Sequence, residues 1–305
     1  MDFSAAAYEW LGQAIGRPGA TLTVERMEGS TSSSVFLVWD RSGQATRRFV
    51  LRVLDNSAWL AEEPDLAAHE AAALDEAQRA GLAAPELVAY DDGAAGFGAP
   101  VVLMSWLQGR IDLRPARRPP WIKELAGQLA AIHRHPAATF PWRYRSWVDA
   151  AALLPPPWTA QPQLWEEAFA LWREPAPDSP TVFIHRDYHP ANVLWRQSAI
   201  SGVVDWINAC RGPAGVDVGH CRTNLALMYG PDVADQFLAS YQAAAPAFAY
   251  QPYWDIDTIL DMALPEPEYY GPWSDFGLAR IAPDQLRQRI EGYLQRVLRR
   301  PAGGR

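Results

Sequence analysis

Lysine and cysteine are nearly missing from this chain of 305 residues. The two cysteines, Cys210 and Cys221, are too few for a disulfide scaffold, and no C-x-x-C pair is present that would indicate a zinc ribbon. A reducing, cytoplasmic compartment is therefore expected. Lys123 is the only lysine, so any task that proteins usually give to lysine falls to arginine here.

The sequence also lacks an excess of basic charge and any long apolar run. Its formal net charge of -8 argues against a nucleic-acid partner and suits a cationic small molecule better. The first 16 residues lack the basic start of a signal peptide, and no stretch of about 18 apolar residues is present to span a membrane. Because 49% of the residues are hydrophobic, the chain can bury one large domain or two lobes.

What the sequence does contain is a sheet-forming first third and a mainly helical remainder. Alternating apolar residues and turns predict a helix over residues 1–20, strands over 21–27, 35–39, 49–54, 87–90 and 100–106, and a helix over 65–80. Later helices are expected over 121–134, 232–244 and 283–299, with a strand over 181–184 and a hairpin of 193–195 and 202–206. This order predicts an α+β fold with an N-terminal lobe over residues 1–106 and a C-terminal lobe over residues 107–305.

One polar segment, residues 185–195, joins two of the predicted strands. It contains His185, Asp187 and Asn192, and Asp205 follows Asn192 by 13 positions, behind a short apolar strand. Phosphoryl transfer needs a carboxylate that takes the proton of the acceptor hydroxyl, and oxygen ligands for the Mg²⁺ that neutralises phosphate. The spacing H-x-D-x-x-x-x-N, with Asp205 behind it, supplies both and indicates a phosphotransferase.

The segment resembles the catalytic loop of the aminoglycoside phosphotransferase family, the small-molecule branch of the kinase-like superfamily. That loop typically reads H-[GR]-D-x-x-x-x-N, often with the His and Pro that stand here as His189 and Pro190. The resemblance continues at Asp205 and Asp217 and covers residues 20 to 300. It implies a two-lobed, protein-kinase-like fold, with a nucleotide-binding lobe first and a catalytic, substrate-binding lobe second.

Carried over to this chain, the resemblance implies a Mg²⁺-dependent kinase for small molecules. Asp187 would be the catalytic base, Asn192 and Asp205 the Mg²⁺ ligands, and Asp217 a brace beneath the catalytic loop. ATP, or GTP, would give its γ-phosphoryl group to a hydroxyl of an aminoglycoside or another amino or sugar alcohol. The protein would act as a monomer or homodimer, without nucleic-acid or membrane partners.

The nucleotide site is expected in the first lobe. Arg52 stands where kinase-like folds usually have a lysine on the third strand, and Glu70 on the next helix is its expected partner. Arginine is also cationic and can bind phosphate bidentately. A turn between the first two strands would cover the phosphates with backbone N–H groups, and a hinge would contact adenine. The turn comprises Ser30, Thr31, Ser32 and Ser33, and the hinge includes Met104 and Trp106.

Two features of the sequence resemble other kinds of kinase. Asp275-Phe276-Gly277 spells the metal motif of protein kinases, but it begins 88 positions after Asp187. The metal-binding Asp should follow the catalytic loop by a short hairpin, as Asp205 does, so the triplet is interpreted as coincidence. A pseudokinase, which binds nucleotide without turnover, is the first alternative function, and Arg52 is its only support.

A metallohydrolase is the second alternative. Its alternating metal ligands would be His185, Asp187 and His189, and Asp205 and His220 could supply further ligands. This hypothesis leaves Asn192 and the upstream sheet–helix–sheet order unexplained.

The acceptor is expected to bind in the second lobe. Between Tyr253 and Phe276 the chain has carboxylates and aromatic residues but no Lys or Arg. Such a segment suits a cationic hydroxyl compound. Its carboxylates are Asp255, Asp257, Asp261, Glu266, Glu268 and Asp275.

Overall fold

The computed structural model describes residues 3–27, 32–43, 45–93 and 95–300. It divides the chain into two compact units, each described by itself. The first unit comprises Met1–Gly109 and Ser201–Asn208, and the second Arg110–Ile200 and Ala209–Arg305. The short segment Ser201–Asn208 therefore joins the first unit, although the sequence suggested the second lobe for it. The predicted lobes, as functional divisions, stay a prediction.

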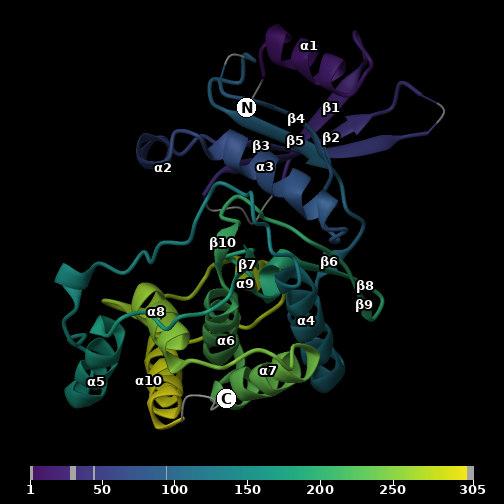
Figure 1. The fold of residues 1–305 in the computed structure, drawn as a ribbon. Helices are drawn as coiled ribbons and strands as arrows, with labels where there is room; N and C mark the ends of the chain where they lie inside the picture. Colours follow the sequence, from purple (N-terminus) through teal and green to yellow (C-terminus); the bar gives the residue numbers. More distant parts are fainter. Residues whose placement is uncertain (1–2, 28–31, 44, 94, 301–305) are drawn as a thin grey trace. The chain divides into compact units, whose positions relative to one another are not determined.

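The first unit is built on an antiparallel sheet with the strand order β1-β2-β3-β5-β4 (Figure 1). The strands are β1 Leu22–Arg26, β2 Ser34–Asp40, β3 Arg47–Val53, β4 Leu87–Asp91 and β5 Val101–Ser105, and the helices are α1 Ala5–Ala14, α2 Ser57–Glu62 and α3 Leu66–Arg79. The predicted strands and the helix over 65–80 are confirmed. The first helix is shorter than expected, because Ile15 caps it and Gly16 takes a φ of 71°.

The two faces of this sheet carry different chemistry, because neighbouring residues of a strand point to opposite sides. On one face, Leu51 of β3 belongs to the same apolar core as Leu11 of α1. Arg52, the next residue, points to the other face, where it is 7% exposed and reaches Glu70 of α3. α1 and α3 therefore cover opposite faces, and buried charge lies on the α3 face.

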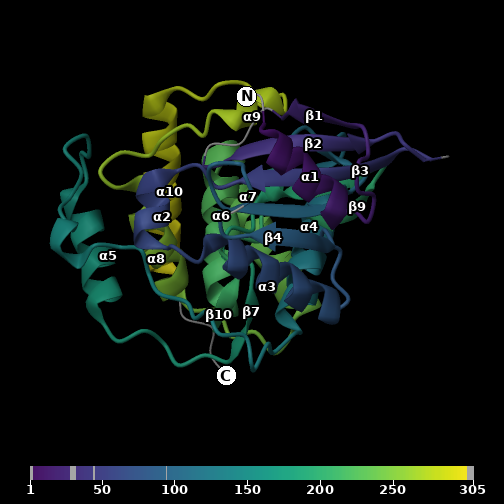
Figure 2. The same ribbon diagram turned by 90° about the horizontal axis from the view of Figure 1, so that it is seen from above.

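The second unit is mainly helical, as predicted (Figures 1 and 2). Its helices are α4 Arg118–His133, α5 Pro162–Arg173, α6 Ala214–Tyr229, α7 Pro231–Ala244, α8 Pro252–Ala263, α9 Pro272–Asp275 and α10 Pro283–Arg299. Its short strands are β6 Arg110–Ile111, β7 Thr181–Ile184, β8 Val193–Arg196, the start of β9 Ala199–Val203, and β10 Cys210–Pro213. β7 pairs with β10, and β6 pairs with β8. α5, α6, α8 and α10 share an apolar core that includes Trp165, Ile256 and Tyr293.

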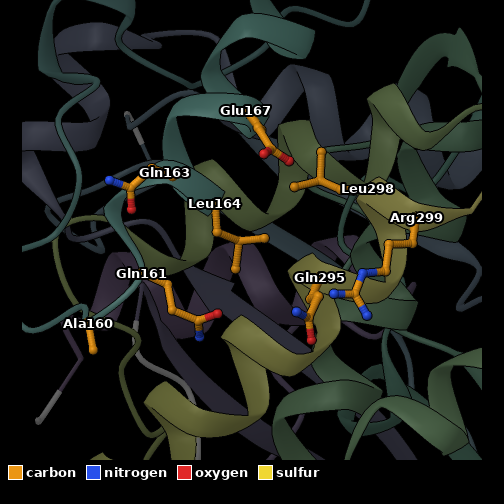
Figure 3. A pocket seen from close by; sticks show the side chains of 8 residues that line it. All are labelled: Ala160, Gln161, Gln163, Leu164, Glu167, Gln295, Leu298 and Arg299. Carbon is orange, nitrogen blue, oxygen red and sulfur yellow. The ribbon is translucent and has the colours of Figure 1, made fainter.

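A surface pocket of about 400 Å³ lies between α5 and α10 (Figure 3). Its lining is largely polar, so it is a hollow of the helical surface rather than an extension of the core. The polar residues are Gln161, Gln163, Glu167, Gln295 and Arg299. Within the described ranges, no helix is long and apolar enough to cross a membrane.

The hairpin that carries Asp205 differs from the prediction. β8 ends at Arg196 and β9 begins at Ala199, so Gln197, with a φ of 58°, lies in the turn. β9 ends at Val203, which places Asp205 beyond the strand instead of within it. The prediction placed the start of the second strand at Gly202. Gly202 instead lies inside β9, where an added Cβ would stand 2.4 Å from the Leu107 side chain.

Candidate active site

The polar segment follows β7 and runs into β8 in the second unit. Asp217, in the first turn of α6, accepts hydrogen bonds from the backbone N–H groups of His185 at 2.8 Å and Arg186 at 2.6 Å. These bonds fix the two residues directly before Asp187, so the brace implied by the resemblance is confirmed. They also hold Arg186 at a φ of 67°, a conformation that is uncommon for residues other than glycine.

Asp217 is fully buried and has the donors that a buried carboxylate needs. Nε2 of His133 lies 3.0 Å from its Oδ2, and Nδ1 of His133 lies 2.6 Å from the hydroxyl of Tyr241. Burial raises the pKa of Asp217, but the hydrogen bond and charge of His133 outweigh it, so that the pKa is lowered. The brace is therefore an anion at neutral pH.

Asp187, the predicted catalytic base, is held by neighbours in its own loop. Nδ2 of Asn192 donates to Oδ2 of Asp187 at 3.0 Å and to its carbonyl oxygen at 2.9 Å. The backbone N–H of Asp187 donates to Nδ1 of His185 at 3.3 Å, so His185 braces the loop as predicted. The Asp187 side chain is 28% exposed, which leaves it accessible to a ligand.

Two histidines lie beside the other oxygen of Asp187. Nε2 of His220, on α6, lies 3.0 Å from Oδ1, and Nε2 of His189 lies 3.6 Å from the same atom. Burial raises the pKa of Asp187, but the charge of His189 and the hydrogen bond from His220 lower it more. The net pKa lies well below its usual range, so Asp187 is ionised at neutral pH.

The residues of the metallohydrolase alternative are engaged in other contacts. Nδ1 of His185 faces the backbone N–H of Asp187, and His220 bonds directly to the Asp187 carboxylate. Among the residues whose side chains the structure describes, no three His, Cys, Asp or Glu groups are arranged to bind one metal ion. The geometry of these side chains therefore gives the metallohydrolase alternative no support.

Charged side chains also gather in the first unit, on the α3 face of the sheet. Nε of Arg52 lies 3.2 Å from Oε2 of Glu70, which confirms the predicted contact, and Nη2 of Arg52 lies 2.8 Å from Oδ1 of Asp205. Burial raises the pKa of Glu70 to about 7, since the charge of Arg52 offsets it only in part and Asp205 adds negative charge. Glu70 therefore gains or loses a proton near neutral pH.

The serine-rich turn between β1 and β2 is described in its second half. Ser32 is partly buried and Ser33 is buried, and Nη1 of Arg52 donates to Oγ of Ser33 at 3.4 Å. This contact ties the turn to the cation on β3. The predicted residues Ser30 and Thr31 fall outside the described residues.

The end of the turn and the predicted hinge are also anchored within the first unit. Ser34 donates to Asp55 from its backbone N–H at 3.1 Å and from its hydroxyl at 2.6 Å, contacts that the sequence did not predict. Met104 is buried in β5, and just beyond that strand the guanidinium of Arg48 lies 3.4 Å from the ring centroid of Trp106. Adenine binding at this hinge stays a prediction.

The two predicted Mg²⁺ ligands belong to different units, Asn192 to the second and Asp205 to the first. Their chemistry fits a hard cation. The amide nitrogen of Asn192 donates to Asp187, which leaves its carbonyl oxygen as the acceptor atom, and Asp205 offers a carboxylate. Asp205 has a φ of 70°, a left-handed conformation that Asp tolerates better than most residues. Binding of one Mg²⁺ by both residues stays a prediction.

The family model for phosphotransferase enzymes (APH) matches residues 23–253 of this sequence. The chain belongs to the phosphotransferase enzyme family. The matched range contains the Asp187 loop, the Asp217 brace and the Arg52–Glu70 pair. The resemblance stated from these residues is therefore confirmed.

Individual proteins similar to this phosphotransferase-family chain include a homoserine kinase from Chelativorans sp. (strain BNC1). It is 30% identical over 176 residues, which cover 51% of this chain and 53% of the kinase. The chain therefore spans about half the length of the curated relative it matches.

Solved structures resemble the chain over nearly its whole length. A Ralstonia eutropha JMP134 protein assigned to the aminoglycoside phosphotransferases has a TM-score of 0.68 at 15% identity, covering 97% of this chain and 98% of its own. The amicoumacin kinase hAmiN, solved with AMP-PNP, Ca²⁺ and Ami, has a TM-score of 0.57 at 13% identity. The likeness covers 90% of this chain and 87% of the amicoumacin kinase. These likenesses confirm the predicted α+β, kinase-like fold of this family member.

The acidic stretch around α8 is mostly structural in this phosphotransferase-family chain. Asp255 is 1% exposed and forms an ion pair with the buried Arg222, and Glu266 pairs with an arginine of α10. Asp257 is buried and accepts hydrogen bonds from neighbouring hydroxyl and indole groups. Asp261 is exposed on the surface of α8. Asp255 and Glu266 therefore already pair with protein cations, and acceptor binding by this segment stays a prediction.

His220 is the main residue near Asp187 that the sequence did not assign to the catalytic loop. The sequence suggested it only as a ligand of the metallohydrolase alternative. A usable signal was present, because His220 follows Asp217 by three positions in a helix and therefore lies on the same helix face.

Proposed function

We propose that this family member transfers the γ-phosphoryl group of ATP, or of GTP, to a hydroxyl of a small molecule. The observation that carries the proposal is the Asp187 carboxylate, which is ionised, partly exposed, bonded to Asn192, and placed on a loop braced by Asp217. A base for hydroxyl activation needs this combination of charge, access and fixed position. The homoserine kinase and the amicoumacin kinase support a small-molecule acceptor by their names.

In the proposed reaction, the acceptor hydroxyl donates a hydrogen bond to the Asp187 carboxylate. The acceptor oxygen forms its bond to the γ-phosphorus while the bond from that phosphorus to the bridging oxygen of the nucleotide breaks. The hydroxyl proton passes to Asp187, and the products are a phosphate ester and a nucleoside diphosphate. Nδ2 of Asn192 bonds both the backbone carbonyl and the carboxylate of Asp187, which keeps the side chain from turning away and lowers the cost of orienting the base.

Arg52 is proposed to bind the nucleotide phosphates in place of the usual lysine. Its contacts with Glu70 and Asp205 orient the guanidinium, and the planar group suits bidentate binding of phosphate. Mg²⁺, bound by Asn192 and Asp205, would neutralise charge on the phosphate oxygens. The AMP-PNP and Ca²⁺ bound to the amicoumacin kinase support a nucleotide and a divalent cation in this fold.

The remaining assignments follow from the same proposal. Residues 1–106 would bind the nucleotide, with Ser32 and Ser33 near the phosphates and Met104 and Trp106 near adenine. Residues 107–305 would carry the base and bind the acceptor. Both cysteines are free and buried, which agrees with the cytoplasmic location that we propose.

The acceptor is proposed to bind beside Asp187, at a small hollow on the second unit. The hollow is lined by Tyr144, Trp147, Arg186, Val216, His220, Asp257, Thr258 and Asp261. Part of the Asp261 side chain reaches solvent there, but partial burial of its carboxyl group and the charge of Asp257 raise its pKa more than the charge of His220 lowers it. A bound cation would therefore stabilise its ionised form. A hydroxyl compound with an amino group fits this combination better than an acid does.

The test is a Mg²⁺-dependent phosphotransfer screen with ATP and GTP against amino sugars, macrolides, amino alcohols and simple sugars. We expect Asp187→Ala to fold, to bind MgATP with unchanged affinity, and to lose transfer by about 10³-fold or more. Asp187→Asn is the matched variant, because it keeps the size of the side chain and removes only its basicity. Turnover of Asp187→Ala near that of the wild type would disprove the role of Asp187 as the catalytic base. Binding of MgATP without transfer to any acceptor would favour the pseudokinase alternative.

A further inference from the structure

One face of α6 reaches the catalytic loop at two points. Asp217 and His220 are three positions apart in the helix, so their side chains lie on the same face. Asp217 accepts from the backbone N–H groups of His185 and Arg186, and His220 places its Nε2 3.0 Å from Oδ1 of Asp187. The same helix therefore fixes the backbone before Asp187 and contacts the carboxylate of Asp187 itself.

The position of α6 is in turn fixed by close packing against α8. An added Cβ at Gly215 would stand 2.2 Å from the Trp254 ring, and one at Gly219 would stand 2.5 Å from the Trp254 carbonyl oxygen. Real Cβ atoms do not approach other atoms so closely, so only glycine allows the two helices this contact. His220 directly follows Gly219, and its backbone is therefore held in a fixed place relative to α8.

The Asp187 carboxylate is consequently held from two sides. Asn192 donates to Oδ2 and the His220 imidazole contacts Oδ1. Each carboxylate oxygen has a second lone pair, so these two bonds leave directions open for a hydroxyl group. With the His220 contact removed, the nearest group at Oδ1 would be Nε2 of His189 at 3.6 Å, which is too far for a hydrogen bond, so the carboxylate plane could tilt.

The charged groups around His220 favour the donor role of its Nε2. Burial lowers the pKa of His220, but the hydrogen bond and charge of Asp187, with the charges of Asp217 and Asp261, raise it above its usual value. Of the other charged groups nearby, His189 lies on the catalytic loop, with its ring centroid 5.9 Å from that of His220. Arg186 and Asp257 line the same hollow.

We propose that His220 is a positioning residue for phosphotransfer, whose Nε2–H group holds the Asp187 carboxylate in the plane that meets the acceptor hydroxyl. This role rests on the function proposed above. It predicts an effect on kcat rather than on binding, because His220 acts on the orientation of the base.

The kinetic test compares His220→Ala with His220→Gln, whose side-chain amide can donate from nearly the place of Nε2. We expect His220→Ala to lower kcat on the order of 10²-fold, as small misplacements of a reacting group do, with KM for MgATP and acceptor within about threefold. His220→Gln should recover most of kcat. His135→Gln, a histidine of the same unit whose ring packs on Phe183, is the control and should leave kcat unchanged.

Three kinetic results would overturn the assignment. The first is a His220→Ala enzyme with wild-type kcat. The second is a His220→Gln enzyme as slow as His220→Ala, because the donor would then be irrelevant. The third is a loss in His220→Ala that appears as raised KM and a lowered unfolding midpoint, which would mark a purely structural residue.

A second measurement needs no acceptor and separates this proposal from the proposed function. Imidazole ¹H–¹⁵N spectra of the full-length protein should show His220 protonated at Nε2, and Asp187→Asn should lower the pKa of His220. An unchanged His220 pKa in Asp187→Asn would disprove the contact. If the wild type phosphorylates no acceptor while the spectra show the contact, the proposed function fails and the His220–Asp187 pair remains.

Discussion

Glu70 in the first unit and Asp217 in the second are both fully buried carboxylates, yet their pKa values move in opposite directions. Burial raises the pKa of Glu70 to about 7, although Nε of Arg52 lies 3.2 Å away. Burial also opposes ionisation of Asp217, but the hydrogen bond and charge of His133 and the backbone N–H of His185 reverse the effect. The two environments differ in how many donors face each carboxylate.

The difference shows what a buried anion needs in order to stay ionised. Asp217 receives two backbone N–H groups and an imidazole, all of which point at its oxygens. Glu70 shares its single arginine with Asp205, which itself adds negative charge. One shared cation does not replace the lost hydration, whereas several fixed donors do. The brace of the Asp187 loop is therefore an anion at neutral pH, while Glu70 in the Arg52 cluster can change its charge there.

The sharpest test of this comparison is Asp217→Asn, which has the largest expected effect. Its amide group would turn a donor toward at least one N–H donor of the loop and remove the charge opposite His133. We expect the free energy of unfolding to fall by about 3–5 kcal/mol, as when one partner of a buried pair is removed. Urea unfolding monitored by tryptophan fluorescence measures the change.

Asp284→Asn is the matched control for that substitution. Asp284 pairs with Arg287 three positions along α10, but its side chain is 92% exposed. Because water screens such a pair, we expect little change in the unfolding midpoint. Equal losses at positions 217 and 284 would remove the distinction between a braced buried anion and a surface anion.

The pH dependence of stability tests the other carboxylate. The folded-state pKa of Glu70, about 7, lies above its ordinary value of 4.5, so the folded protein binds the extra proton between these values. The Glu70 contribution is therefore fully present below pH 4.5 and is lost as the pH rises through 7, by about 3 kcal/mol in total.

Glu70→Gln makes this contribution measurable, because the amide has a similar size and does not titrate. The unfolding free energy of the wild type minus that of Glu70→Gln should fall between pH 5 and pH 8 and then level off. For Asp217 the pH dependence has the opposite sign: because its folded-state pKa is lowered, its contribution to the unfolding free energy is lost as the pH falls into the acid range. A wild-type curve parallel to that of Glu70→Gln over this range would refute the raised pKa.

The smallest expected effect comes from packing rather than charge. Gly219→Ala adds a Cβ 2.5 Å from the Trp254 carbonyl oxygen, so α6 must shift and loosen the Asp217 contacts. We expect a loss of about 1–3 kcal/mol, typical of overpacking. Gly127→Ala on α4 is the matched control, because an added Cβ there meets nothing within 4 Å. Since alanine favours helix, that control should be neutral or slightly stabilising, and equal losses in thermal denaturation would contradict the packing argument.

Much of the secondary structure could be predicted from local sequence patterns. The strands of the first unit and the main helices were predictable, because strand alternation and helix spacing are local properties. The Arg52–Glu70 contact was predicted from the resemblance to kinase-like folds. The second strand of the hairpin was predicted to begin at Gly202, which instead lies inside β9 in close contact with Leu107. The contact of His220 with Asp187 was missed, because it depends on how α6 packs against α8.

By itself, the sequence determined which residues are candidates for phosphotransfer. The spacing of Asp187, Asn192 and Asp205 is written in the chain, as is the replacement of lysine by Arg52. Only the tertiary structure decided their charge and orientation. Burial raises the pKa of Glu70, whereas several donors outweigh burial at Asp217 and lower its pKa, and no local pattern records either environment. The glycines of α6 allow its close contact with α8, and His220 on α6 contacts the Asp187 carboxylate.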